Sequence, residues 1–206
     1  MKNNLSFREF YKRRLPHIQI AGSTYFITFR LVNSLPLEAL DRLAEERQKI
    51  NQLPQSQKEA ANQAWFTQYD DYLDKALCGD LHLKNQQIAD MVADSIHFRD
   101  GKVYDLISYC IMFNHVHLIC TPLFKEKDIY FGLAEILHSL KRHTAREANK
   151  ILQRNGAFWQ DESYDHFIRN ESELERTVKY ILYNPVKANL VKEQTDWKWS
   201  YCKYNM

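Results

Sequence analysis

Apolar and polar positions alternate most clearly in the middle of the chain, where they predict strands over 103–112 and 115–121. Met112-Phe113-Asn114 between them is typical of a tight turn, because asparagine tolerates the left-handed backbone conformation. His115 and His117 lie two residues apart, so their side chains share one face of the second strand. We expect a substrate to reach this face, while the opposite face packs in the core through Val116, Leu118 and Cys120.

Periodicity also predicts two more strands and five helices. Aromatic and β-branched residues indicate a strand over 24–31, and another is expected near 164–169. Helical spacing predicts helices that begin near Asn33-Ser34 and near Trp65, and further helices over about 86–97, 129–150 and 172–184. Gln-, Asn- and Ala-rich residues 51–63 indicate a surface break. Asp128 and Ser172 are expected to cap the last two helices, and Pro185 to end the last one.

The chain of 206 residues has the length of one domain, or of one domain with an insertion. We expect a single domain over 1–206, with a basic N-terminal arm over 1–20 and a C-terminal tail over about 190–206. A helical stretch over about 37–97 separates the first two strands. Hydrophobic content of 45% and aromatic content of 13% are enough for a sizeable core.

Composition also bears on the cellular compartment. The N-terminus is polar and charged, unlike a signal peptide, and no apolar stretch approaches the roughly 20 residues of a membrane span. The four cysteines are scattered, and Cys110 and Cys120 lie in apolar runs, which favours buried thiols over disulfides. We therefore expect a soluble, cytoplasmic protein. The formal net charge of +2 says little about partners.

Basic residues cluster in two places. Arg13 and Arg14 lie in the N-terminal arm among aromatic residues, an arrangement that can follow phosphates and stack on bases. Lys141, Arg142 and Arg146 lie in the second half of a predicted helix, where they suit phosphate contacts. A solvated terminus and a solvated helix face would give the same patterns, so both interpretations stay open.

Histidine and tyrosine supply the candidate chemistry. Two imidazoles on one strand face can hold a divalent metal, although two ordinary histidines on a half-buried sheet would show the same spacing. Tyr180 lies on the last helix with Asn184 one turn later, and an amide oxygen is a further metal ligand. Tyrosine can act as a nucleophile on a phosphate that the metal polarises, or it can simply pack with a wet hydroxyl. These ligands suit Mg²⁺ or Mn²⁺.

The same residues stand in motifs that resemble one protein family. The run Met112-Phe113-Asn114-His115-Val116-His117-Leu118 resembles the histidine–hydrophobe–histidine (HUH) motif of the single-tyrosine transposases. The run Tyr180-Ile181-Leu182-Tyr183-Asn184-Pro185-Val186-Lys187-Ala188 resembles the tyrosine helix of one branch, the REP-associated tyrosine transposases. Shorter matches follow in the expected order: Tyr25-Phe26-Ile27-Thr28-Phe29-Arg30, Phe158-Trp159-Gln160, Tyr164-Asp165-His166 and Trp199-Ser200.

The resemblance implies an α+β fold, with a central antiparallel sheet and flanking helices on a ferredoxin-like plan and a helical insertion between the first two strands. It implies a metal-dependent enzyme that nicks and rejoins single-stranded DNA through a 5′-phosphotyrosine intermediate, with Tyr180 as the nucleophile. The partners it implies are single-stranded or hairpin DNA, including REP-type repeats.

Two other functions are compatible with the sequence. A catalytically silent nucleic-acid-binding module on the same fold would use the same aromatic and basic surface. A structural Zn²⁺ site would need Cys110 or Cys120 beside the histidines, but Cys120 falls on the opposite strand face. Intact His115, His117 and Tyr180 favour the enzyme, because binding alone does not need that trio. The DNA sequence recognised and the oligomeric state are left open.

Overall fold

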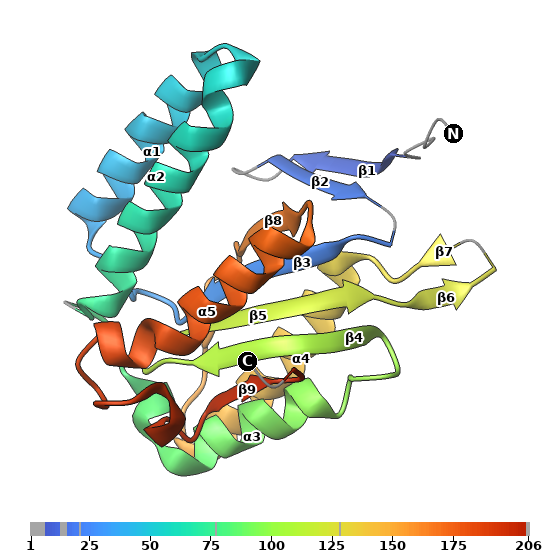
Figure 1. Ribbon diagram of the computed structural model, residues 1–206. Coiled ribbons are helices and arrows are strands. Elements are labelled where there is room, and N and C mark those ends of the chain that lie inside the picture. The colour runs from blue at the N-terminus through green and yellow to red at the C-terminus, as the bar shows by residue number, and fades with distance from the viewer. Residues whose placement is uncertain (1–6, 13–15, 21, 77, 128, 205–206) are drawn as a thin grey trace.

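A five-stranded antiparallel sheet forms the centre of the molecule (Figure 1). The computed structural model describes residues 7–12, 16–20, 22–76, 78–127 and 129–204, with side chains from residue 22 onward. Side by side, the strands run in the order β8 (Tyr164–Ile168), β3 (Thr24–Arg30), β5 (His115–Pro122), β4 (Tyr104–Ile111) and β9 (Ser200–Cys202). The antiparallel sheet and its four predicted strands are confirmed, whereas the edge strand β9 has no counterpart in the sequence prediction.

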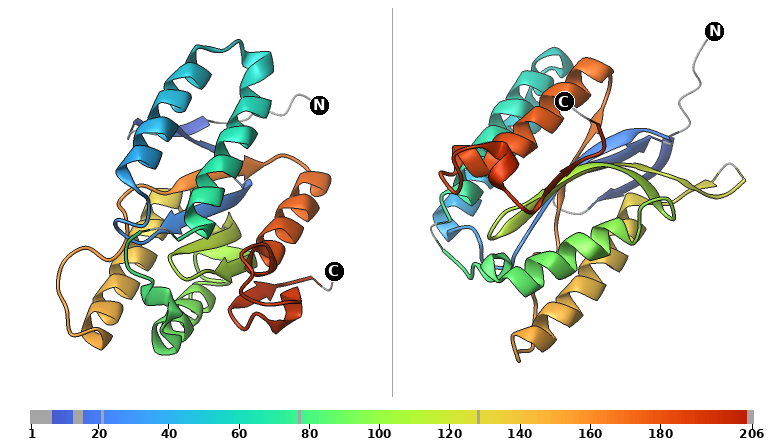
Figure 2. Two further views of the ribbon diagram at one scale, coloured as in Figure 1. Left: turned by 90° about the vertical axis from the view of Figure 1, so that its left-hand side faces the viewer. Right: turned by 60° about the horizontal axis from the view of Figure 1, so that its bottom comes forward.

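Helices cover both faces of this sheet (Figure 2). The helices α3 (Gln86–His97) and α4 (Leu133–Ile151) pack on one face, and α5 (Glu171–Lys187) packs on the other. The elements β3, α3, β4, β5, α4 and β8 follow one another in β-α-β-β-α-β order. The core under α3 and α4 contains, as predicted, Val116, Leu118 and Cys120. His115 and His117 are therefore on the face that α5 covers.

The helical insertion between β3 and β4 includes a hairpin of two long helices, α1 (Leu37–Gln52) and α2 (Gln55–Asp74), which projects from the sheet (Figure 1). The predicted surface break between two helices is present but much shorter than 51–63, because α1 ends at Gln52 and α2 begins at Gln55. Gln, Lys, Glu and Ala have high helix propensity, so a helix forms here without an apolar stripe. Trp65 ties the two helices together, since its indole Nε1 donates to the carbonyl oxygen of Leu43 at 2.8 Å.

The two ends of this helical hairpin meet at a narrow neck. Asn33 and Gly79 both have positive φ angles, of 60° and 76°. A Cβ atom at Gly79 would lie 2.5 Å from the carbonyl oxygen of Asn33, so the neck has room only for glycine. The thiol of Cys78 donates to the same carbonyl oxygen at 3.3 Å. The chain therefore enters and leaves the helical hairpin at nearly the same point.

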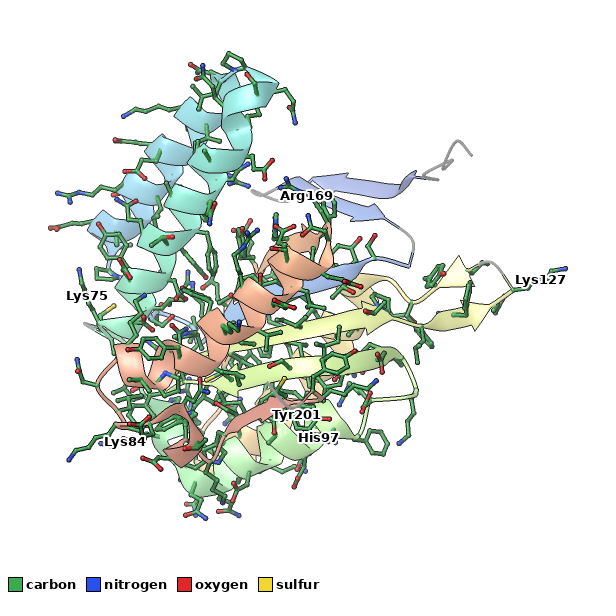
Figure 3. The ribbon with its side chains drawn as sticks, in the orientation of Figure 1. Lys75, Lys84, His97, Lys127, Arg169 and Tyr201 are labelled. Carbon is green, nitrogen blue, oxygen red and sulfur yellow. The ribbon has the colours of Figure 1, made fainter. Side chains whose placement is uncertain are left out.

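Two short β-hairpins lie outside the central sheet. The strands β1 (Phe7–Lys12) and β2 (Pro16–Ile20) pair within the N-terminal arm, and Arg13 and Arg14 lie outside the described residues. The strands β6 (Phe124–Glu126) and β7 (Ile129–Tyr130) follow β5, with Lys127 at the tip of their hairpin (Figure 3). Because residues 129 and 130 pair as a strand, α4 begins at Leu133, later than predicted. Its expected cap, Asp128, lies outside the described residues.

The helix ends differ from the prediction at three places. α1 begins at Leu37 because the preceding proline keeps the residues before it extended. The side-chain oxygen of Asn170 accepts a hydrogen bond from the backbone of α5, so Asn170 rather than Ser172 caps this helix. Pro185 does not end α5, which runs to Lys187. Near a helix end a proline disturbs only the last turn, and the helix tolerates it.

The C-terminal tail folds back onto the sheet. The short 3₁₀ helix η2 (Gln194–Asp196) precedes β9, and the indole Nε1 of Trp197 donates to the carbonyl oxygen of Ile111 at 3.0 Å. A second 3₁₀ helix, η1 (His82–Lys84), leads into α3. None of the helices in the described part of the chain is both long and apolar enough to cross a membrane.

Candidate functional site

The two histidines of β5 are held in matching orientations. The Nδ1 atom of His115 lies 2.7 Å from Oδ1 of Asn114, and Nδ1 of His117 lies 2.8 Å from the hydroxyl of Thr28. Their Nε2 atoms are only 3.1 Å apart. Because an amide oxygen accepts, the Nδ1 of His115 donates and its Nε2 keeps the lone pair. Fixing Nδ1 so that Nε2 is presented is the arrangement that proteins use to orient metal-binding histidines.

A carboxylate from the helical insertion completes this cluster. Asp70 of α2 places its Oδ1 atom 3.2 Å from Nε2 of His117 and 3.9 Å from Nε2 of His115. Among the described residues, Asp70, His115 and His117 form a group whose ligand atoms all lie within 4.8 Å of one another. All three side chains have no exposed surface. The expectation of an accessible histidine face is therefore wrong, because α2 and α5 cover it.

The last helix brings Tyr180 and Asn184 to the same cluster. Nδ2 of Asn184 lies 2.7 Å from Nε2 of His117, and the hydroxyl of Tyr180 donates to Oδ2 of Asp70. Tyr180 is half-buried, and its ring centroid lies 6.3 Å from that of His117. The other tyrosine of the same turn, Tyr183, is 56% exposed and belongs to no such contact among those described. The one-turn spacing in the sequence thus places a hydroxyl and an amide beside the histidines.

Burial and charge set the protonation states in this cluster. Burial lowers the pKa of His115 to about 3, so its imidazole is neutral and can act as a ligand. Burial also raises the pKa of Tyr180 far above its ordinary value, and the charge of Asp70 adds to this effect. Burial alone would raise the pKa of Asp70, but His117 and His115 outweigh it and keep the carboxyl ionised.

The donor set fits a divalent cation. Oδ1 of Asp70 and Oδ1 of Asn184 are both buried, and neither accepts a hydrogen bond. Buried polar oxygens normally have a hydrogen-bond partner. Two buried oxygens without one, beside two imidazole nitrogens, therefore indicate a site for a positive charge. A half-turn of the Asn184 amide would exchange its nitrogen for its oxygen next to the histidines. Two nitrogen and two oxygen donors suit Mn²⁺, and Mg²⁺ through the oxygens.

Ion pairs fasten α5 to α2 beside the cluster. Nζ of Lys187 lies 2.6 Å from Oδ1 of Asp71 and 3.0 Å from Oδ2 of Asp74. Burial and the neighbouring Asp70 raise the pKa of Asp74 to about 6. At the opposite end of α5, Arg169 forms an ion pair with Glu59 of α2 (Figure 3). Ion pairs thus connect α2 to α5 near both ends of α5.

The basic residues of α4 lie on the other face of the sheet from Tyr180. The ammonium of Lys141 is engaged in the fold, because it donates to the carbonyl oxygens of Gln160 at 2.5 Å and Asp161 at 2.8 Å. Arg142 and Arg146 are exposed. The structure therefore does not bring the predicted DNA-binding residues of α4 to the histidine–tyrosine cluster.

Sequence patterns missed Asp70, although one signal was present. The buried stripe of α2 contains Phe66, Tyr69 and Leu73. Asp70 falls on this stripe by helical spacing, and a carboxylate on an apolar stripe is uncommon unless it is paired. The metal-ligating group found among the described residues contains no cysteine, so the structural Zn²⁺ site gains no support.

Comparisons with known proteins identify the family of the chain. The family model described as "Transposase IS200 like" matches residues 82–184, which is half of the chain and includes both histidines, Tyr180 and Asn184. A Haemophilus influenzae protein assigned as a REP-associated tyrosine transposase is 26% identical over 102 residues. That alignment covers 47% of this chain and 58% of the relative's length.

A solved structure of a REP-associated tyrosine transposase bound to a REP hairpin is 20% identical, with a TM-score of 0.49. It covers 94% of this chain and 82% of that chain. The family match stands on the sequence model, whose range includes β5 and α5 as far as Asn184. The chain therefore belongs to the IS200-like transposase family.

Proposed function

We propose that this protein nicks and rejoins single-stranded DNA through a 5′-phosphotyrosine intermediate on Tyr180. The observation that supports this most is the meeting of one tyrosine hydroxyl with a preorganised two-histidine cluster. His115, His117 and Asn184 would hold the divalent cation, Mg²⁺ or Mn²⁺. A bound cation would polarise the scissile phosphate and offset its negative charge.

The covalent step balances without a co-reactant. The phenolic oxygen of Tyr180 attacks phosphorus, and the bond between phosphorus and the 3′ oxygen breaks. The phenol loses one proton and the departing 3′ oxygen gains one, which leaves a free 3′ hydroxyl and a 5′ phosphate on the tyrosine. Rejoining is the reverse reaction, with a 3′ hydroxyl as the attacking group.

The assignment to Tyr180 over its neighbours follows from contacts. The hydroxyl of Tyr180 is already in the cluster, whereas Tyr183 points to solvent. Tyr164 is 9% exposed and stacks on Phe66 with ring centroids 4.4 Å apart, so it serves packing. Because both histidines are fully buried, side chains that cover them have to move before a phosphate can reach a cation held there.

The proposed partner is single-stranded or hairpin DNA, with REP-type repeats as the candidates that the relatives' names suggest. Arg142 and Arg146, together with Arg13 and Arg14, are proposed to contact phosphates away from the site. With such a substrate, the proposed location is the cytoplasm. Lys141 is left out of this set because its ammonium is already engaged within the fold.

Replacement of Tyr180 tests the proposal directly. Tyr180→Phe removes one oxygen and should give no covalent adduct with labelled single-stranded DNA and Mn²⁺, while the fold and DNA affinity are retained. Mass spectrometry of the wild-type adduct should identify Tyr180, and Tyr183→Phe is the matched control with normal adduct. An adduct on another tyrosine would refute the assignment, and DNA binding without any adduct in the wild type would identify a silent binding module.

A further inference from the structure

We propose that Asp70, supplied by the helical insertion, is a ligand of the divalent cation and also positions the nucleophile Tyr180. The inference rests on the proposed function and extends it to a residue outside 82–184, the part that the family model matches. The family match therefore assigns no role to Asp70. The insertion would then be part of the active site and not an appendage.

The two oxygens of Asp70 have two different tasks. Oδ2 accepts the hydrogen bond from the Tyr180 hydroxyl, which fixes the direction of the phenol. Oδ1 is buried, accepts no hydrogen bond, and lies 3.2 Å from Nε2 of His117. A cation held between Oδ1 and this nitrogen would be a common partner for both atoms. Oδ1 is therefore placed as a metal ligand would be.

The charges around Asp70 also favour a bound cation. Its side chain has no exposed surface, and removing a carboxylate from water costs several kcal/mol unless the charge is compensated. The ammonium of Lys187 is 3.9 Å from Oδ2, and it lies closer to two other carboxylates, Asp71 and Asp74. The single positive charge of Lys187 is thus shared among three carboxylates. A divalent ion at the histidines would supply the charge that the protein lacks.

The rest of α2 is fastened so that Asp70 stays in place. Nδ2 of Asn114, next to His115, donates to the carbonyl oxygen of Leu73 at 2.9 Å. The ion pair between Lys187 and Asp74 holds the next turn of α2 to α5. The ring of Phe66 packs against that of Tyr180 with centroids 6.2 Å apart. These contacts come from the turn before β5 and from α5. The C-terminal part of α2 therefore forms one side of the site.

A comparison of Asp70→Asn with Asp71→Asn separates the proposed role from a general charge effect. Both variants remove one carboxylate from the same turn of α2, but Asp71 is 45% exposed and contacts neither histidine among the described contacts. Mn²⁺ binding to the metal-free protein, measured by calorimetry without DNA, should be roughly 10–100-fold weaker in Asp70→Asn. It should be unchanged in Asp71→Asn.

The second readout concerns Tyr180. At saturating Mn²⁺, Asp70→Asn should form the covalent adduct at least about tenfold more slowly, because about 1.4 kcal/mol of positioning corresponds to that factor. Affinity for single-stranded DNA in EDTA should not change. Far-UV circular dichroism checks folding, and Asp70→Ala is the second variant if the amide itself disturbs the site.

Failure of this inference is distinguishable from failure of the proposed function. Wild-type Mn²⁺ affinity in both Asp70 variants, with normal adduct formation, would overturn the role of Asp70 and leave Tyr180 as the nucleophile. Weakened Mn²⁺ binding in a protein whose wild type forms no adduct would support Asp70 as a ligand and refute the nicking function.

Discussion

Asn114 offers a sharp test of how the site is built, because one small side chain makes two buried hydrogen bonds. Its Oδ1 accepts from Nδ1 of His115 at 2.7 Å, and its Nδ2 donates to the carbonyl oxygen of Leu73 at 2.9 Å. Only 2% of the residue is exposed. Asn114→Ala therefore leaves Nδ1 of His115 without a partner in a place that water does not reach, whereas the carbonyl oxygen of Leu73 still accepts from the backbone N–H of Ala76 at 3.0 Å.

The expected loss of stability follows from these two contacts. Leaving the buried Nδ1 of His115 unsatisfied costs about 1–3 kcal/mol, and losing the second hydrogen bond to the Leu73 carbonyl adds about 0.5–1.5 kcal/mol. With a central value near 3 kcal/mol and about 2–4 °C per kcal/mol for a chain of this size, the melting temperature should fall by about 6–12 °C. The loosened His115 should also weaken Mn²⁺ binding by roughly 10–100-fold.

Urea unfolding followed by tryptophan fluorescence gives the change in unfolding free energy, and calorimetry gives the Mn²⁺ affinity. Thr28→Val is the matched control, because it preserves side-chain shape and removes only the contact with Nδ1 of His117, at about 1 kcal/mol. A loss below 1 kcal/mol in Asn114→Ala, with wild-type Mn²⁺ affinity, would refute the reasoning that this side chain couples the histidines to α2.

Two further predictions concern pH and salt. Folding keeps His115 neutral by lowering its pKa from 6.5 to about 3, so the unfolded chain binds the extra proton between these values. The metal-free protein should therefore lose stability as the pH falls from about 6.5 toward 3, by up to ~1.4 kcal/mol per pH unit from this group, and urea titrations of His115→Gln should show a flatter profile. Replacing Arg142 and Arg146 by alanine should reduce the slope of log DNA affinity against log salt concentration by about 1–2. Lys141→Ala should leave this slope unchanged. Equal slopes in wild type and the double variant would count against phosphate contacts.

The sheet was predictable because its strands carry local signals. β3, β4 and β5 are runs of aromatic and β-branched residues, and the period of two correctly separated His117 from Leu118. The first half of α2 escaped prediction because Gln- and Ala-rich residues form a helix there by propensity, without an apolar face. β7 displaced the start of α4 through a pairing with β6, and pairing is a tertiary event that periodicity does not reveal.

The candidate site was predictable only where its residues lie close together in sequence. Tyr180 and Asn184 share one helix turn, and His115 and His117 share one strand face, so spacing alone placed each pair. Asp70 joins Tyr180 across 110 positions of the chain, and no local pattern encodes such a contact. The burial of the histidines depends on the same long-range packing of α2, which is why an accessible face was expected instead.

The neck between Asn33 and Gly79 joins the helical hairpin to the rest of the chain at one place. Both connections pass through one point, with a side chain at Gly79 excluded by the Asn33 carbonyl oxygen. A chain that closed directly across this point would keep the strands of the sheet, the two histidines and the tyrosine helix in its sequence, since none of them lies between Asn33 and Gly79. It would lack the one carboxylate that reaches the Tyr180 hydroxyl. An insertion attached at a single point can be gained or lost in evolution. Here its presence adds one negative charge, that of Asp70, beside the two histidines.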